Sequence, residues 1–352
     1  MKKILISLDK IKNPNSGLGK VSIDFYNEIS KRGDFEYTFL VPKGYENKTP
    51  ITSDTITLTL WRRIFSGYMK RFDLVHILHQ LPSYSLSGAK KLLFTIHDLN
   101  FLYTKNAKKR EKYRRKIESN TQRATALAFI SKFTQNDFFN NISSAEGKPS
   151  MVIYNGSAPL TEPSPKPDWC PDTPFLFSVG IFSQKKNFHT LIPFLKNLPT
   201  RYNLIIAGNS TTGYGIEIKN LIKEHNLDHQ VFLPGMISEA EKSYLYHNCE
   251  ALLVPSIAEG FGLPVIEAMS IGKPVFCSDK TSLKEIGADF AYFWTSFDPH
   301  KMVEVFTEGM QNFKHDEQRK ERQIKYAKTY RWEENVTKYI QFYKDILNNF
   351  ND

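Results

Sequence analysis

Short apolar runs alternate with longer helical patterns along most of this chain. Such runs are typical of strands buried on both faces of a parallel sheet. In the first half we expect strands at 3–8, 37–41, 74–78, 91–96, 127–130 and 151–154. The second half repeats the alternation, with strands expected at 175–179, 204–207, 231–233, 251–254 and 275–277. Strands that alternate with helices predict an α/β fold with parallel sheets.

A proline-rich segment separates the two halves. Residues 158–174 carry six prolines and no periodic apolar pattern, so neither a helix nor a central strand continues through them. We therefore expect an N-terminal domain at 1–157, a linker at 158–174 and a second domain at 175–330. An amphipathic helix follows at 333–352, with apolar residues at three- and four-residue spacing. Its apolar face needs a partner.

The stretch from Val254 to Pro274 contains the most informative pattern in the sequence. A buried strand ends at Val254, two glycines permit a tight turn, and a helix is expected from Pro264 until Gly272 ends it. A glycine loop before a helix N-terminus presents N–H groups and the positive end of a helix dipole. This arrangement predicts a phosphate site.

Glu259 and Glu267 frame that turn. A carboxylate repels phosphate, so we expect this pair to accept hydrogen bonds from hydroxyl groups, as a nucleotide sugar would present them. The structural alternative is that Glu267 complements the helix dipole while Glu259 is solvated. Their seven-residue separation across a Gly-Phe-Gly-Leu-Pro turn favours a functional role.

The segment E-G-F-G-L-P-V-I-E-A-M-S-I-G-K-P-V resembles the Glu-x7-Glu signature of retaining glycosyltransferases of the GT-B fold, family 4. The resemblance implies two Rossmann-like domains whose parallel sheets face a central cleft. It implies that Glu259 holds donor-sugar hydroxyls and that Glu267 holds the ribose. The rest of the turn would line the donor site: Gly260, Phe261, Gly262 and Leu263.

Two further segments of the second half are similar to that family. V-G-I-F-S-Q-K-K-N-F resembles its diphosphate-binding stretch, which implies that Gly180 lets the backbone turn while Lys185 and Lys186 bind the leaving diphosphate. Many members carry arginine after the glycine, where this chain has Ile181, so Lys185 would supply the second charge. The turn at Gly235 would approach the base, and Ser238 with Glu241 predicts a capping box.

The first half contributes two candidate segments. N-P-N-S-G-L-G-K places Gly17 and Gly19 at a helix start, where they would approach a phosphate or a sugar, or would form a plain connector. As a dinucleotide fingerprint this segment is weak. T-I-H-D-L-N places His97 at the carboxyl end of a strand, and the resemblance implies that His97 contacts the donor sugar. Its neighbour Asp98 would orient His97 or cap the following turn.

Composition narrows the class of protein. The chain has 352 residues and a net charge of +10. Its three scattered cysteines have no C-x-x-C spacing, so we expect a reduced, cytoplasmic protein without zinc. The apolar run at its start is short and is broken by Asp9, so we expect neither a signal peptide nor a membrane span. The basic excess has no nucleic-acid motif beside it, and we expect no nucleic acid partner. Eight basic residues against one acid lie between Lys105 and Lys116. They form either a solvated helix face or a peripheral contact with the inner membrane.

Together these observations predict a transferase of the hexosyltransferase class. It would move a sugar from a nucleoside diphosphate sugar to a hydroxyl of a glycan or lipid-linked acceptor, as in lipopolysaccharide or other surface polysaccharide synthesis. His97, Lys186 and Glu259 are the expected catalytic residues. No Asp-x-Asp pair is present, so we expect neither a metal nor a cofactor. A nucleotide-sugar epimerase or phosphorylase, or a non-catalytic scaffold of a polysaccharide-assembly complex, are the alternatives.

Overall fold

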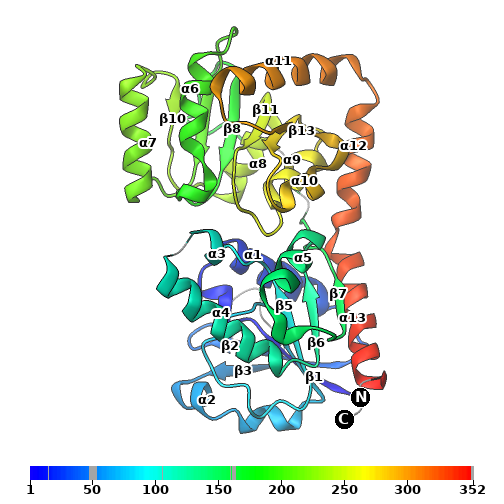
Figure 1. Cartoon of the computed structure of the whole chain (residues 1–352). Helices are drawn as coiled ribbons and strands as arrows, with labels where there is room; N and C mark the ends of the chain where they lie inside the picture. Colours follow the sequence, from blue (N-terminus) through cyan, green and yellow to red (C-terminus); the bar gives the residue numbers. More distant parts are fainter. Residues whose placement is uncertain (15, 47–53, 105, 159, 161–163, 350–352) are drawn as a thin grey trace. The chain divides into compact units, whose positions relative to one another are not determined.

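The computed structural model describes residues 1–14, 16–46, 54–104, 106–158, 160 and 164–349 (Figure 1). Three sequence-based predictions fall partly outside the described residues: Lys105 of the basic run, positions 159 and 161–163 of the proline-rich segment, and the last three positions of the C-terminal helix. The chain divides into two compact units. Unit 1 comprises Met1–Ala158 and Tyr330–Asp352, and unit 2 comprises Pro159–Thr329.

Within its described residues, unit 1 contains a seven-stranded sheet in the order β3-β2-β1-β4-β5-β6-β7, and every neighbouring pair is parallel. Helices connect the strands because parallel neighbours need a crossover. The strands are β1 (Lys3–Ser7), β2 (Glu36–Pro42), β3 (Thr55–Leu58), β4 (Leu74–Ile77), β5 (Leu92–Ile96), β6 (Ala126–Phe129) and β7 (Ser150–Val152). The α-helices are α1 (Gly17–Ile29), α2 (Leu60–Ile64), α3 (Phe101–Thr104), α4 (Ala107–Gln122), α5 (Lys132–Asn141) and α13 (Trp332–Asn349). Short 3₁₀ turns are η1 (Asp9–Lys12), η2 (Gly67–Arg71) and η3 (Ser143–Ala145).

Unit 2 is built in the same way around a second sheet, in the order β10-β9-β8-β11-β12-β13 among the described residues, again all parallel. Its strands are β8 (Phe175–Val179), β9 (Asn203–Ala207), β10 (Val231–Phe232), β11 (Ala251–Val254), β12 (Val275–Ser278) and β13 (Ala291–Trp294). The helices are α6 (Leu191–Lys196), α7 (Gly213–Glu224), α8 (Glu239–Asn248), α9 (Leu263–Ser270), α10 (Ser282–Gly287), α11 (Pro299–His315) and α12 (Arg319–Ala327). Its 3₁₀ turns are η4 (Gln184–Lys186), η5 (Phe188–Thr190) and η6 (Ala288–Phe290), and η7 (Lys328–Tyr330) leads into α13.

The structure confirms the α/β class with parallel sheets and every strand that the apolar runs predict, to within one or two residues at each end. It adds β3 and β13, which the sequence analysis did not predict. Both are edge strands, and each has two of its four residues only half buried. β3 alternates threonine with apolar residues, whereas β13 is a continuous apolar run, Ala-Tyr-Phe-Trp, that the sequence analysis overlooked.

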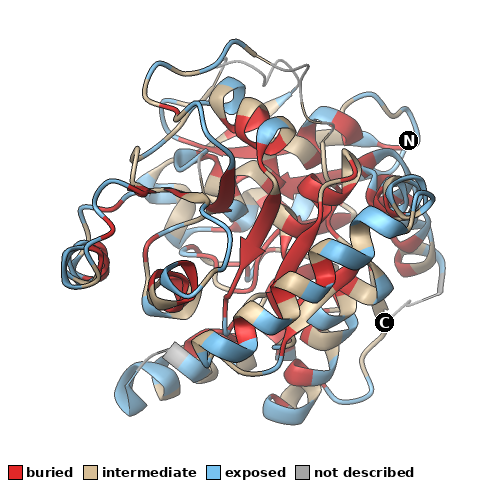
Figure 2. Ribbon diagram, turned by 90° about the horizontal axis from the view of Figure 1, so that it is seen from above, coloured by how far each residue is buried: buried red, intermediate tan, exposed pale blue. Residues whose placement is uncertain are grey.

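Each unit has its own hydrophobic core. Figure 2 shows the strands buried along their length while the outer faces of the helices are exposed. In unit 1 the core lies between the sheet and its helices, with Phe94, Phe129 and Phe138 fully buried. In unit 2 the corresponding residues include Phe194, Phe276 and Trp294. Burial of this apolar surface is the main favourable contribution to folding of each unit.

The C-terminal helix α13 packs within unit 1. The Tyr343 hydroxyl is hydrogen-bonded to His76 Nδ1 at 2.6 Å, and Lys91 Nζ donates to the Ile346 carbonyl at 3.0 Å. The rings of Trp332 and Tyr339 meet Phe25 of α1 edge-on. The apolar face of this helix therefore has its partner in the unit formed by the start of the chain.

Candidate active site

The glycine turn of unit 2 has the geometry that its sequence predicts. β11 ends at Val254, and α9 begins directly after Gly262, which adopts a φ of +113°. A Cβ atom at Gly262 would lie 2.8 Å from Leu283 Cδ2, so both torsion and space favour glycine there. Pro264 lies in the first turn of α9. Gly260 and Phe261 are buried, and Leu263 is half buried.

Lys186 and Glu259 form an ion pair beside this turn. Lys186 Nζ lies 2.6 Å from Glu259 Oε1, and both side chains are largely buried, with exposures of 13% and 14%. Burial raises the pKa of the Glu259 carboxyl, but the charges of Lys186 and Lys185 outweigh it and hold the pKa below its ordinary value. The pair therefore holds a cation, which is suited to phosphate oxygens, next to an anion, which is suited to hydroxyl donors.

Two neighbours on the segment after β12 hold the Glu259 backbone in place. Thr281 Oγ1 accepts from the Glu259 N–H at 3.0 Å, and Ser282 Oγ donates to the carbonyls of Glu259 and Phe261 at 3.0 and 2.9 Å. Thr281 adopts a φ of +53°, which is uncommon for a β-branched residue. The sequence analysis did not identify Thr281 or Ser282 as site residues. A Thr-Ser pair separated by two residues from the end of a buried strand was the available signal.

Glu267 is more deeply buried than Glu259, with an exposure of 5%. Its Oε1 accepts from Lys242 Nζ at 3.1 Å, and its Oε2 accepts from the Tyr246 hydroxyl at 2.7 Å. Burial lowers the pKa of Lys242, but Glu267 and Glu239 outweigh it and raise that pKa above its ordinary value. A carboxylate offers about four acceptor positions, so these two donors leave acceptor capacity for a hydroxyl ligand. Sequence reasoning missed Lys242 and Tyr246, whose i, i+4 spacing places both on one face of α8.

Three glycines follow β8, β9 and β10 at the carboxyl ends of these strands. The Gly180 N–H donates to the Ala207 carbonyl at 3.0 Å, and the Gly208 N–H donates to the Gly235 carbonyl at 2.8 Å. A Cβ atom at Gly180 would lie 2.9 Å from Lys186 Cε, so glycine lets that lysine pass close to the backbone. Lys185 lies in the same loop, and its carbonyl accepts from the Ile257 N–H at 2.8 Å. The structure thus brings Gly180, Lys185, Lys186 and the Glu259 turn together.

The predicted capping box of Ser238 and Glu241 is confirmed at the start of α8.

In unit 1, His97 lies directly after β5 and is buried. Its Nε2 lies 2.7 Å from the Leu78 carbonyl, and because a carbonyl can only accept, Nε2 carries the hydrogen and Nδ1 is an acceptor. Burial lowers the pKa of His97 to about 4, although its bond to the Leu78 carbonyl opposes this shift. His97 is therefore neutral near pH 7. The Asp98 carboxylate accepts from the Asn100 N–H at 2.9 Å and so caps the following turn.

The glycines of the first helix differ in what they require. Gly19 lies in the first turn of α1, where a Cβ atom would lie 2.0 Å from the Asn13 carbonyl oxygen. A close approach of backbone to backbone therefore explains this glycine. A Cβ atom at Gly17 would have no atom within 4 Å, so packing does not explain that residue.

A second polar group in unit 1 was not predicted. His79 Nε2 lies 2.8 Å from Asp9 Oδ1, and the Ser7 hydroxyl donates to the same oxygen at 3.0 Å. The Ser7 hydroxyl also lies 2.5 Å from the Tyr84 hydroxyl. This group lies beyond the carboxyl ends of β1 and β4, where ligands of parallel sheets bind.

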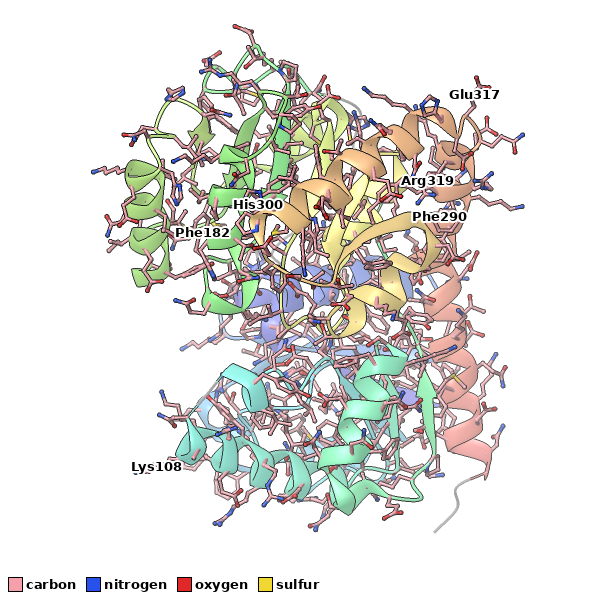
Figure 3. The ribbon with its side chains drawn as sticks, turned by 45° about the horizontal axis from the view of Figure 1, so that its top comes forward. Lys108, Phe182, Phe290, His300, Glu317 and Arg319 are labelled. Atoms are coloured by element: carbon pink, nitrogen blue, oxygen red, sulfur yellow. The ribbon has the colours of Figure 1, made fainter. Side chains whose placement is uncertain are left out.

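The basic run lies on α4. Arg114 forms ion pairs with Glu111 and Glu118, and Arg115 pairs with Glu111. Acidic residues of α4 therefore neutralise part of the charge of the basic run. Lys108 remains exposed on the outer side of α4 (Figure 3).

Over the ranges that the structure describes, no three histidine, cysteine or acidic side chains lie close enough together to hold a metal ion. Within the same residues, no helix combines the length and the apolar character needed to cross a bilayer.

Comparison with known proteins identifies the fold and gives a family match for the second half of the chain. Residues 162–330 match the sequence model of glycosyl transferases group 1. The chain is 22% identical to the O-antigen chain mannosyltransferase B of Escherichia coli, over 97% of this chain and 99% of that protein. It is 28% identical to the O-antigen chain mannosyltransferase RfbU of Salmonella typhimurium, over 80% and 84% of the two chains.

Among solved structures, the sucrose-phosphate synthase of Thermosynechococcus elongatus superposes with a TM-score of 0.76, at 17% identity over 98% of this chain and 99% of that one. HepE of Anabaena, solved in complex with UDP-glucose, superposes with a TM-score of 0.74 at 16% identity, over 98% and 100%. These structures share the GT-B fold. Residues 162–330 are therefore similar to glycosyl transferases group 1, and the GT-B fold extends along nearly the whole chain.

Proposed function

We propose that this protein transfers a sugar from a nucleoside diphosphate sugar to a hydroxyl of a glycan or lipid-linked acceptor, in the synthesis of a surface polysaccharide. The observation that carries the proposal is the buried Lys186–Glu259 pair beside the N-terminus of α9. Mannosyltransferase relatives that build O-antigen chains and a UDP-glucose complex of a structural neighbour support the substrate class.

In the proposed reaction the ion pair exchanges partners. The diphosphate of the donor takes Lys186, with Lys185 beside it, and Glu259 then accepts hydrogen bonds from the sugar hydroxyls. The bond between the anomeric carbon and the diphosphate oxygen breaks, and its electron pair remains on that oxygen, where Lys186 stabilises the charge. One such donor contributes about 3 kcal/mol to transition-state stability.

The acceptor hydroxyl oxygen bonds to the anomeric carbon and its proton passes to the leaving diphosphate. We propose retention of configuration, which the resemblance to retaining glycosyltransferases implies. We also propose that no metal takes part in this step, because the lysines already supply the positive charge. Glu267 holds the ribose through its remaining acceptor positions. His97 offers its Nδ1 lone pair to a hydroxyl of the donor sugar, with its neutral imidazole oriented by the Leu78 carbonyl.

Calorimetry with free nucleoside diphosphates tests the donor assignment. UDP, GDP and ADP are compared first, in order to identify the base that the protein prefers. Lys186→Ala should weaken binding of the preferred nucleotide about tenfold or more, because a charged contact to phosphate is lost. Lys219→Ala, on an exposed face of α7, is the matched control. Equal affinity of Lys186→Ala and the parent would remove the diphosphate assignment.

For location, we propose peripheral contact of α4 with the cytoplasmic face of the inner membrane. Each basic residue near an anionic surface contributes about 1 kcal/mol. Replacing Lys108, Lys109 and Lys112 by Gln should release the protein from vesicles that contain phosphatidylglycerol. Equal sedimentation of variant and parent with these vesicles would leave α4 as a solvated helix face.

A further inference from the structure

A cavity lies in unit 1. It has a volume of about 310 Å³ and is lined by Asp9, Lys10, Lys12, Asn13, Arg63 and Ser83. These residues come from η1 after β1, from α2 after β3 and from the segment after β4. The cavity therefore lies beyond the carboxyl ends of unit 1 strands, where ligands of parallel sheets bind.

The charge of this cavity favours an anion. Lys10, Lys12 and Arg63 contribute three cations, and Asp9 contributes the one carboxylate among the lining residues. The Asp9 side chain is 6% exposed; its Oδ1 is bonded to His79 and Ser7, and its Oδ2 lies 3.9 Å from Lys10 Nζ. With one carboxylate against three cations, the lining keeps a net positive charge. Arg63 is held at the cavity by its bond from Nη1 to Ser83 Oγ at 2.8 Å. Lysine and arginine side chains around a hollow with hydroxyl and amide groups are suited to phosphate oxygens.

The helix that supplies Arg63 also carries an unusual apolar surface. Leu60, Trp61, Ile64 and Phe65 are exposed by 75%, 72%, 59% and 62%. The rings of Trp61 and Phe65 stack, with centroids 5.7 Å apart. Large apolar side chains gathered in this way mark an interaction surface. Figure 1 shows α2 at the periphery of unit 1, after the edge strand β3.

The cavity and this apolar surface are fixed to one another. The Arg63 carbonyl accepts from the Ser85 N–H at 2.8 Å, which ties α2 to the segment that carries Ser83. Between Thr55 and Phe72 the sequence has four basic residues and no acidic one. An anionic group beside a hydrocarbon chain would thus meet cations and apolar side chains from the same helix.

We infer that unit 1 binds a phosphate-bearing lipid, with its phosphate or diphosphate in the cavity of Lys10, Lys12 and Arg63 and its hydrocarbon chain on the apolar surface of α2. This inference rests on the proposed function, since it names the acceptor as a glycan carried on such a lipid. Trp61 and Phe65 suit the boundary between lipid headgroups and hydrocarbon, where aromatic rings concentrate.

Three soluble probes test this site without a sugar donor. Farnesyl diphosphate carries both parts of the ligand, inorganic diphosphate carries the anion alone, and decyl maltoside carries a chain without charge. Calorimetry should rank their affinities in that order, and the emission of Trp61 should shift to shorter wavelength with farnesyl diphosphate. Trp61→Phe should abolish this shift. If decyl maltoside binds as tightly as farnesyl diphosphate, the anion site is wrong.

Two sets of substitutions separate the two parts. Replacing Lys10, Lys12 and Arg63 by Gln should lower the farnesyl diphosphate affinity about 100-fold, since each cation near an anionic lipid contributes about 1 kcal/mol. Replacing Leu60, Ile64 and Phe65 by Ser should lower that affinity and leave the affinity for inorganic diphosphate unchanged. The matched control replaces three exposed unit 2 lysines by Gln: Lys196, Lys219 and Lys223.

An equal loss in the control would mean that net charge alone attracts the probe, and the inference would fail. It would also fail if the Ser variant kept the parental farnesyl diphosphate affinity, or if neutral phosphatidylcholine vesicles shifted Trp61 emission as strongly. Nucleoside diphosphate binding of each variant shows whether unit 2 is intact. A protein that binds farnesyl diphosphate as expected yet transfers no sugar would overturn the proposed function while the lipid site stands.

Discussion

The two units share an architecture, yet they treat charge in opposite ways. Both place polar side chains beyond the carboxyl ends of a parallel sheet. Unit 2 buries its charges in pairs, Lys186 with Glu259 and Lys242 with Glu267. Unit 1 places Lys10, Lys12 and Arg63 around an open cavity with the single carboxylate of Asp9, which lies 3.9 Å from Lys10 Nζ, and it buries neutral histidines elsewhere in its core. A diphosphate in unit 2 must therefore take Lys186 from Glu259, whereas an anion in the unit 1 cavity meets an excess of cations.

Acidification should produce the largest difference between the units. Burial lowers the pKa of His76 to about 3 and that of His97 to about 4, and it lowers the pKa of His79 as well. In unit 2 burial lowers the pKa of His189, which the charge of Glu217 opposes. In the unfolded chain these histidines bind a proton near pH 6.5, whereas in the folded protein they bind it only at lower pH. The free energy of unfolding is therefore at its full value above pH 6.5 and declines as the pH falls below it.

Each histidine can remove about 1.4 kcal/mol per pH unit. Between pH 6.5 and 4.5 unit 1 should therefore lose more free energy of unfolding than unit 2. Hydrogen exchange resolved by peptide, corrected for intrinsic rates, measures the two units separately. If both units lost the same free energy of unfolding, the buried histidines would not distinguish unit 1 from unit 2.

Lys186→Ala should have the next largest effect. Turnover should fall about 100-fold, because the charge that stabilises the leaving diphosphate is lost. The Glu259 carboxylate is left buried without its partner, so the variant should also unfold more easily, as broken buried pairs do. Steady-state kinetics and thermal melting of the variant, with Lys219→Ala beside it, separate the two effects. If Lys186→Ala turned over at the parental rate, the Lys186–Glu259 pair would have only a structural role.

Glu267→Ala should lower nucleoside diphosphate affinity about tenfold, because the ribose loses an acceptor and two donors lose theirs. Glu267→Gln keeps the shape and one acceptor oxygen, so it should recover part of that affinity. Calorimetry of both variants with the preferred nucleotide measures this. If nucleotide affinity is unchanged while the melting temperature falls, Glu267 serves only to hold Lys242 and Tyr246.

The smallest effect is expected at His97. His97→Ala should leave nucleoside diphosphate affinity unchanged and reduce transfer about fivefold, since one hydrogen bond to the sugar contributes about 1 kcal/mol. The comparison of nucleotide affinity with turnover separates this role from a general loss of folding. Transfer at the parental rate would exclude a contact between His97 and the reacting sugar.

The sequence by itself determined the fold class and the location of the glycine turn between β11 and α9. Continuous apolar runs predict the inner strands because those strands are buried on both faces, while the edge strand β3 alternates threonine with apolar residues and was not predicted. The Gly-Phe-Gly-Leu-Pro turn is a local pattern, so its helix start and its torsions follow from residues close in sequence.

Only the tertiary structure decided which side chains meet. Lys186 and Glu259 are 73 residues apart, and Lys242 reaches Glu267 across 25 residues, so neither pairing has a local signal. The sheet of unit 2 brings them together because parallel strands end at the same edge. The cavity of unit 1 likewise joins three separate segments. Its cations indicate a lipid ligand only because the exposed apolar face of α2 lies on the helix that supplies Arg63.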